Sequence, residues 1–191
     1  MTATTTPRPG GRSARVQAAV HRATRELIEL HGRAELTVPM IAARAEVTPS
    51  TIYRRWGDLG ELLADVSVER MKPDSEPADT GSVAGDLVAW AQQFHEEMSS
   101  PIGLAMMKDV LSTGANGEGT APCQCAQFTA AQIAVIFERG VARGEPVPEV
   151  QRAMDLVVAP IIYRALWGPV PASSAVVERW VAECLDGGGT R

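Results

Sequence analysis

The sequence is poor in aromatic residues, and it has neither many cysteines nor a long apolar run. Only 5% of the 191 residues are aromatic, so Ala, Val, Leu and Ile must fill most of any core. The longest apolar run, Leu156–Ile162, contains Pro160 and is far shorter than the roughly 18–20 residues that cross a bilayer. No apolar signal-peptide segment stands near the N-terminus. We therefore expect a cytoplasmic protein with no membrane contact.

Cysteine and histidine offer little for a disulfide framework, a metal site or catalysis. The cysteine count is odd, and Cys123 and Cys125 are spaced too closely for a zinc knuckle. We interpret these two as reduced thiols at a loop–helix boundary, with redox sensing or metal binding as the alternative. The histidines lack spaced partners, and no Ser/His/Asp set or phosphate loop occurs, so we expect no enzyme, no metal and no cofactor. The histidines are His21, His31 and His95.

Charge is distributed unevenly along the chain. Residues 1–56 hold nine arginines against four glutamates, a net +5, whereas residues 57–191 carry −10 within an overall charge of −5. A basic N-terminal quarter on an acidic body is typical of a small DNA-binding unit joined to a body that does not bind DNA. The overall acidity alone would have argued against a nucleic-acid partner.

Helical periodicity runs through most of the chain, and no alternating strand pattern occurs. Apolar residues recur at spacings of three and four, Gly and Pro separate the segments, and hydroxyl or Asp residues precede several of them. This pattern predicts an all-α fold. The expected helices span 13–31, 38–45, 49–55, 59–71, 83–98, 101–113, 125–143, 149–167 and 172–185.

Composition also indicates the domain organisation. Residues 1–12 read as a flexible basic arm, and the Pro-, Asp- and Gly-rich stretch 72–82 reads as a boundary. We expect a DNA-binding domain over 13–72 and a helical domain over 83–186.

Two short segments around residues 37–56 carry the pattern of a helix-turn-helix. Thr37 and Thr48 are suited to N-caps, and Pro39 and Pro49 then fall in the first turns. Ile52 and Trp56 stand four apart and face a core, which leaves hydroxyl, phenol and guanidinium groups facing outward.

The string Leu36-Thr-Val-Pro-Met-Ile-Ala-Ala-Arg-Ala-Glu-Val-Thr-Pro-Ser-Thr-Ile-Tyr-Arg-Arg-Trp56 closely resembles the DNA-binding segment of TetR-type regulators. The preceding amphipathic helix with Gly32 and the following Glu61-Leu62-Leu63 also fit, over roughly 60 residues. The resemblance implies a three-helix DNA-binding domain followed by a helical effector-binding and dimerisation domain. Two positions depart from the family's pattern: Glu46 replaces a turn glycine, and Leu59 replaces a phosphate-binding lysine.

The resemblance implies double-stranded operator DNA as a partner, with the helix from Pro49 in the major groove. Arg54 or Arg55 would pair with guanine, and Tyr53 would bond a phosphate. The helix N-termini at Thr37 and Thr48 would favour a phosphate, and Arg8 and Arg12 would follow the minor groove. The candidate DNA-binding residues are Thr37, Thr48, Pro49, Ser50, Thr51, Tyr53, Arg54, Arg55, Arg8 and Arg12.

The same resemblance implies a homodimer and a small-molecule effector. The last two helices are the expected dimer surface, with ordinary core packing as the alternative; its candidates are Val157, Ile161, Ala165, Val177, Trp180 and Val181. An apolar or aromatic effector would lie among the central helices, with His95 and Tyr163 as polar contacts. The candidate ligand-binding residues, each with plain core packing as the alternative, are Trp90, Phe94, Met98, Met106, Met107, Phe128, Phe137, Met154, Tyr163 and Trp167.

The function that follows is a DNA-binding regulator, a repressor released from a palindromic operator by its ligand. Three alternatives stay open at this point: a DNA-binding protein without a ligand, an activator, and a helical small-molecule-binding protein that does not bind DNA.

Overall fold

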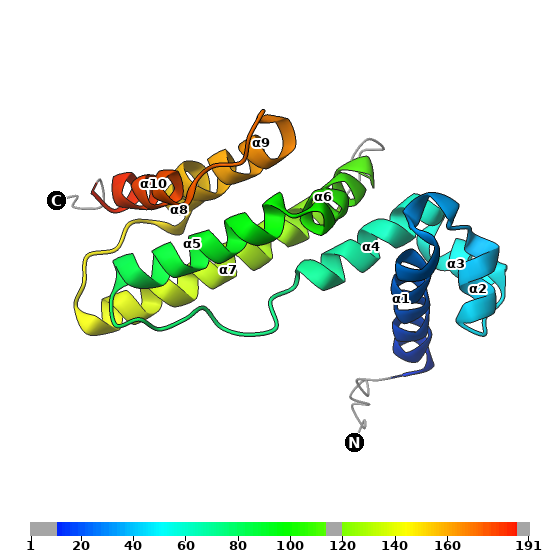
Figure 1. Ribbon diagram of the computed structural model, residues 1–191. Coiled ribbons are helices and arrows are strands. Elements are labelled where there is room, and N and C mark those ends of the chain that lie inside the picture. Colours follow the sequence, from blue (N-terminus) through cyan, green and yellow to red (C-terminus); the bar gives the residue numbers. More distant parts are fainter. Residues whose placement is uncertain (1–10, 114–119, 187–191) are drawn as a thin grey trace, which may run out of the picture. The chain divides into compact units, whose positions relative to one another are not determined.

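A computed structural model describes residues 11–113 and 120–186, and this part of the chain is helical with connecting turns (Figure 1). The predicted all-α class is confirmed. The elements are α1 (Arg12–His31), η1 (Arg33–Glu35), α2 (Val38–Arg44), α3 (Pro49–Trp56), α4 (Leu59–Met71), α5 (Val83–Ser99), α6 (Pro101–Thr113), α7 (Thr120–Arg143), α8 (Val150–Ala153), η3 (Met154–Val158), α9 (Ala159–Trp167) and α10 (Ser174–Asp186). None of the helices in the described ranges combines the length and apolarity that a bilayer crossing needs.

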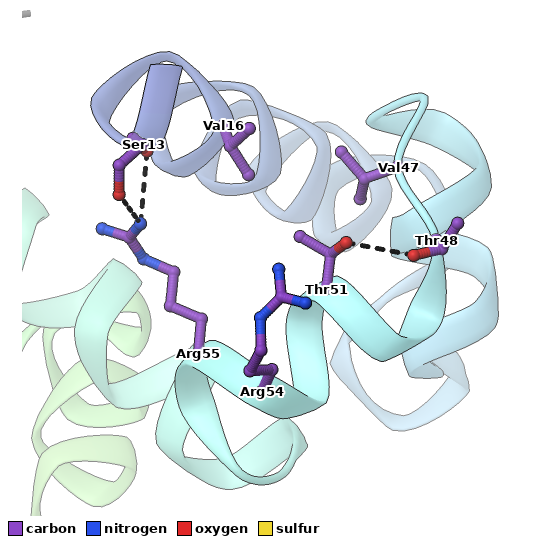
Figure 2. A pocket seen from close by; sticks show the side chains of 7 residues that line it. All are labelled: Ser13, Val16, Val47, Thr48, Thr51, Arg54 and Arg55. Carbon is purple, nitrogen blue, oxygen red and sulfur yellow. Dashed lines mark hydrogen bonds between the residues drawn. The ribbon is translucent and has the colours of Figure 1, made fainter. Parts of the chain in front are cut away.

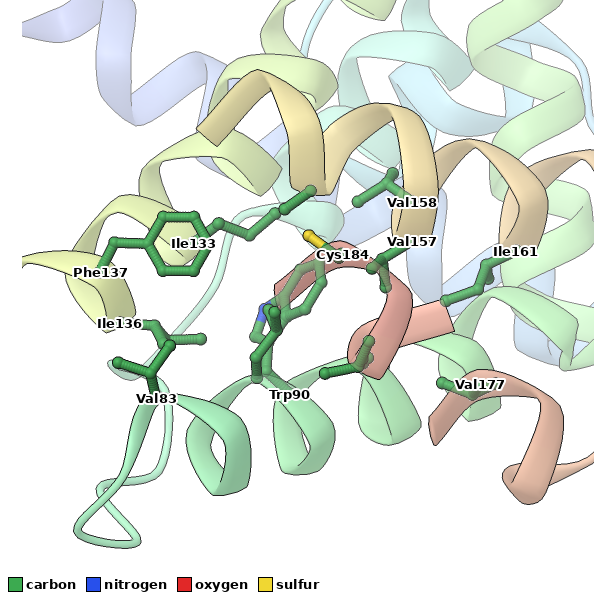
Figure 3. Close-up of a cluster of buried hydrophobic side chains, with 14 of the residues drawn as sticks. Val83, Trp90, Ile133, Ile136, Phe137, Val157, Val158, Ile161, Val177 and Cys184 are labelled. Atoms are coloured by element: carbon green, nitrogen blue, oxygen red, sulfur yellow. The ribbon is translucent and has the colours of Figure 1, made fainter. Parts of the chain in front are cut away.

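The chain divides into two compact units that meet within α4, between Val66 and Ser67. Each unit has a hydrophobic core of its own. The core of the first unit joins α1, α2, α3 and α4 through fully buried residues such as Val20, Ile41, Ile52 and Leu62. The core of the second unit joins α5, α7, α9 and α10, as Figure 3 shows.

Local sequence signals account for the ends of the first helices. Gly32 ends α1 with a φ of 77°, a conformation that glycine adopts without steric cost. The Thr37 hydroxyl accepts a hydrogen bond from the Met40 amide and caps α2, as predicted. The Asp58 carboxylate likewise accepts from the Glu61 amide at the start of α4. α1 itself begins at Arg12, one residue before the predicted start, and Gly11 is its N-cap.

The stretch between α4 and α5 is fastened along α7. The Arg139 guanidinium donates to the Pro77 carbonyl at 2.8 Å and pairs with Glu76 at 2.6 Å. Gln132 donates to the Ser75 carbonyl, and Arg143 pairs with Asp79 at 3.2 Å. Pro77 is buried. This stretch, which we call the strap (residues 72–82), therefore packs with the second unit.

The helix expected over 149–167 contains a π-helical segment, η3, just before Pro160. Proline lacks an amide hydrogen, and its ring crowds the carbonyl four residues earlier. A wider turn accommodates both, and the Ala159 amide donates to the Met154 carbonyl, five residues back.

Four residues predicted for a dimer surface are instead core residues. Val157, Ile161, Val177 and Val181 are at most 1% exposed and pack in the second unit's own core. The alternative of ordinary core packing therefore holds for these four. Trp180 is partly buried beside this core, and the Arg164 guanidinium lies 5.4 Å from its ring centroid.

Candidate nucleic-acid interface

α3 presents one apolar face to the core and one polar face to solvent. Ile52 is fully buried and Trp56 is 9% exposed, so both lie in the first unit's core. Pro49, Ser50 and Tyr53 are exposed on the other side. The helix therefore carries its readable side chains outward, as a recognition helix must.

Three hydroxyl groups gather at the N-terminus of α3. The Thr48 hydroxyl lies 2.9 Å from the Ser50 hydroxyl and 3.0 Å from that of Thr51. Thr48 occupies the N-cap position, but its side chain makes no capping bond to the backbone. Pro49 has no amide hydrogen, and the Thr51 amide donates to the Thr48 carbonyl at 2.9 Å. The positive end of the helix dipole at this uncapped terminus favours an anion such as phosphate.

The two arginines at the end of α3 have different roles. The Arg55 guanidinium donates to the Ser13 hydroxyl at 2.7 Å, to the Ser13 carbonyl at 3.2 Å and to Gln17 at 2.5 Å. It ties α3 to α1 and lies 5.2 Å from the centroid of the Trp56 ring. Arg54 is exposed, and within the described ranges no hydrogen bond or ion pair engages its side chain. Of the two predicted guanine readers, Arg54 is therefore the one left unengaged.

Two adjoining hollows lie beside α3. The first has a volume of about 600 Å³ and is lined by Ser13, Val16, Val47, Thr48, Thr51, Arg54 and Arg55 (Figure 2). The second, of about 390 Å³, shares Val16 and Val47 with it and adds Arg15 and Glu46. Together they form a concave strip edged by three guanidinium groups. This geometry suits a phosphate backbone that passes beside a helix seated in the groove.

One carboxylate joins the helices of the first unit. Asp65 of α4 accepts hydrogen bonds from Trp56 Nε1 at 2.7 Å and Gln17 Nε2 at 3.2 Å, and its Oδ2 lies 2.8 Å from His21 Nε2. Burial raises the pKa of Asp65, but the hydrogen bonds from His21 and Trp56 and the charge of protonated His21 outweigh burial and hold that pKa below its ordinary value. The sequence analysis missed this junction, because its members are far apart in the chain.

Glu46 occupies the turn between α2 and α3 with a φ of 55°, a left-handed conformation. Glu46 therefore keeps the left-handed backbone that a turn glycine would adopt, rather than forming a different turn. Its carboxylate lines the second hollow, where it would repel a phosphate. Leu59, the other departure from the family's pattern, packs against the first unit's core.

We expect Glu46→Gly to raise the free energy of unfolding by about 1 kcal/mol, because glycine removes the steric cost of the left-handed backbone. It should also tighten DNA binding by removing a negative charge. Glu46→Gln is the matched control, since it removes the charge but keeps the backbone cost. A melting temperature that is raised equally in both variants would contradict the explanation that glycine relieves backbone strain.

The predicted ligand-binding residues are spread between interior and surface. Trp90, Met98, Met107 and Phe137 are buried, and the Trp90 and Phe94 rings stack with centroids 5.1 Å apart. Met106, Phe128 and Met154 are partly buried. Tyr163 and Trp167 are 64% and 67% exposed, so we do not retain them as residues of an interior pocket. The spacing of apolar residues is the same on a helix face that packs in the core and on a face that stays exposed in the monomer. It therefore does not distinguish the two.

The remaining residues singled out in the sequence are Arg8, Arg12, Cys123 and Cys125. Arg8 and the Arg12 side chain lie outside the described residues. The Cys123 side chain does too, whereas the Cys125 thiol lies 3.4 Å from the Met71 sulfur. Burial raises the pKa of Cys125, which disfavours the reactive thiolate.

Comparison with known proteins places both units in one family. The model described as "Bacterial regulatory proteins, tetR family" matches residues 21–66, and "Tetracyclin repressor-like, C-terminal domain" matches residues 77–184. The HTH-type transcriptional regulator YdeS of Bacillus subtilis is 28% identical over 78% of this chain and 77% of its own length.

Solved structures agree with this placement. The TetR family transcription regulator SCO0332 is 26% identical, with a TM-score of 0.68 over 90% of this chain and 97% of that one. FadR of Thermus thermophilus, a TetR family repressor solved with lauroyl-CoA, shares the fold at 18% identity, with a TM-score of 0.64 over 92% of this chain and 96% of its own. The chain belongs to the TetR family and is a DNA-binding transcriptional regulator with a helix-turn-helix.

Proposed function

We propose that this regulator is a homodimeric repressor that reads a palindromic operator and leaves it when a small apolar or aromatic molecule binds the second unit. It would act in the cytoplasm, on the nucleoid. The observation that carries the DNA part is the outward face of α3, with its hydroxyl cluster and the unengaged Arg54 beside a concave strip edged by arginines. Thr37, Thr48, Ser50, Thr51 and Tyr53 would hold phosphates or base edges, and Pro49 would meet a thymine methyl group.

A palindromic site requires two copies of α3 related by a two-fold axis. An exposed apolar patch on α9 and the turn after it, made of Tyr163, Trp167 and Val170, supports an interface there. The rings of Tyr163 and Trp167 lie 5.5 Å apart, and each of the three side chains is at least 64% exposed. Aromatic side chains grouped in this way are enriched in interface cores. We name these three residues the α9 patch.

Trp167→Glu is expected to shift the dimer toward monomer, with a dissociation constant at least about 30-fold higher, because a charge at an interface core is poorly solvated. Sedimentation velocity over a concentration series measures this shift. Val141→Glu is the matched control, since Val141 of α7 is 63% exposed and lies outside the α9 patch. Equal dimer dissociation constants in Trp167→Glu and the wild type would mean that the interface does not lie at the α9 patch.

The ligand part of the proposal is supported by a ligand complex of a protein with the same fold and by the apolar interior of the second unit. FadR, which shares this fold, was solved with lauroyl-CoA, so a ligand that carries a long apolar chain has a precedent on this scaffold. Here buried Trp90, Met98 and Phe137 offer apolar surface among the central helices. An effector releases DNA only if it binds the DNA-incompetent state more tightly.

The proposal is tested by titrating the protein into labelled DNA from upstream of its own gene. Fluorescence anisotropy at two salt concentrations should show binding that weakens steeply with salt and survives unrelated competitor DNA. Equal affinity for unrelated DNA would favour a non-specific binder, and binding that raises transcription in a reconstituted assay would favour an activator. Salt-independent or absent binding would favour a helical protein that does not use DNA.

A further inference from the structure

Two polar atoms on the inner side of α5 are buried without a protein partner. His95 Nε2 and Ser99 Oγ have almost no accessible surface, and no hydrogen-bond partner for either lies within the described residues. The two side chains stand four residues apart, one helical turn, and therefore on the same face. That face continues from Leu87 and Ala91, both fully buried. Such orphaned atoms are rare in stable proteins, and each calls for an explanation.

The polar side chains that neighbour the pair along the chain are engaged with other partners. Gln92 donates to Glu178 of α10, and Gln93 donates to Glu97. The Ser100 hydroxyl donates to the Glu97 carbonyl and accepts from the Gly103 amide. These neighbours along the chain therefore leave His95 Nε2 and Ser99 Oγ without a hydrogen-bond partner.

The same half of α5 also buries aromatic and methionine side chains. Phe94 stacks on Trp90, and Met98 is 6% exposed. α6 packs against α5 and contributes buried Met107. Methionine side chains rearrange easily around a bound molecule, so this interior can accommodate a small ligand without a preformed cavity.

We propose that His95 and Ser99 together hold a hydroxyl group on an otherwise apolar effector. A hydroxyl group donates one hydrogen bond and accepts another, so a single oxygen can donate to the imidazole and accept from the serine. A carboxylate fits less well, because the pair lies in the last turns of α5, at the negative end of the helix dipole, beside exposed Glu96 and Glu97. The effector class is thus a neutral alcohol or phenol. This inference rests on the proposed function only in calling the bound molecule an effector.

The first test is the stability of the protein alone. If the two atoms lack a partner in solution, replacing them with apolar groups of similar shape removes a penalty. We expect His95→Phe to leave the melting temperature unchanged or raised. Ser99→Ala should raise it more than Ser112→Ala, because the hydroxyl of Ser112 on α6 already donates to the Asp109 carbonyl and its removal costs that hydrogen bond. A clear drop in both His95→Phe and Ser99→Ala would mean that ordered water satisfies the pair, and the proposal would fall.

The second test uses 4-methylphenol and p-xylene, which differ only by a methyl group in place of the hydroxyl. In the full chain without DNA, calorimetry should give binding of 4-methylphenol at least about 10-fold tighter than p-xylene. The 15N shift of His95 Nε2 should move with the phenol only, and His95→Phe/Ser99→Ala should remove the preference. Equal binding of the two probes, or an unmoved His95 resonance, overturns the proposal. Because no DNA is present, this outcome is independent of the operator titration, which tests the proposed function separately.

Discussion

Arg54→Ala is expected to weaken binding to the operator by about 1–3 kcal/mol, or about 5- to 150-fold, with little change in thermal stability. The reason is that Arg54 is exposed and lines the larger hollow, and its side chain has no hydrogen bond or ion pair within the part of the chain that the structure describes. The loss of Arg54 should also narrow the difference in affinity between operator and unrelated DNA, because contacts to the bases determine the specificity. Competition anisotropy with the two DNAs measures both effects.

Arg55→Ala is the matched comparison, one residue away on the same helix. It should lower the melting temperature, because it removes the bonds to Ser13 and Gln17 that join α3 to α1. Its effect on DNA binding should follow from the misplaced helix and appear equally on operator and unrelated DNA. If Arg55→Ala relaxed specificity and Arg54→Ala did not, the assignment of the two arginines would be reversed.

Asp65→Ala is expected to cost about 2–4 kcal/mol of folding free energy in the first unit, since it leaves Trp56 and His21 without their shared acceptor. His21 is 1% exposed, so water replaces the lost bond poorly. Circular dichroism during heating measures the loss. Glu61→Gln, an exposed acidic position on the same helix, should stay within about 0.5 kcal/mol of the wild type.

The Asp65 junction also predicts an acid dependence with a definite sign. Because the folded pKa of Asp65 lies below its ordinary value of 3.8, the ionised carboxylate stabilises the folded state above that pH. This stabilisation is lost as the pH falls through the folded pKa. The difference in unfolding free energy between wild type and Asp65→Ala should therefore shrink below about pH 4. A difference that grows on acidification would show that the carboxylate is not the stabilising species.

Local signals let the sequence predict much of the fold. The bounds of α4 and α6 were predicted as observed, because Asp58 and Pro101 mark their starts. The stop at Gly32 follows from glycine's tolerance of positive φ. These features depend on a few adjacent residues, which a single sequence displays directly.

Contacts between residues that are far apart in the sequence could not be predicted from such local signals. Arg55 and Arg54 are indistinguishable in the sequence, and only the position of Ser13 and Gln17 on α1 separates their roles. The junction at Asp65 likewise depends on three helices meeting. The exposure of Tyr163 and Trp167 could not be predicted, because an apolar helical face reads alike whether the chain itself or a partner covers it.

The strap has a consequence for dividing the chain into fragments. A piece that begins at Val83 would contain α5 to α10 but would leave Arg139 without Glu76 and the Pro77 carbonyl. Arg143 would lose Asp79 as well, and the apolar surface under Pro77 would be opened to water. A piece that begins at Pro73 keeps these contacts while still omitting α4. We expect the longer piece to be the better starting point for hybrids that join this second unit to the helix-turn-helix of a relative.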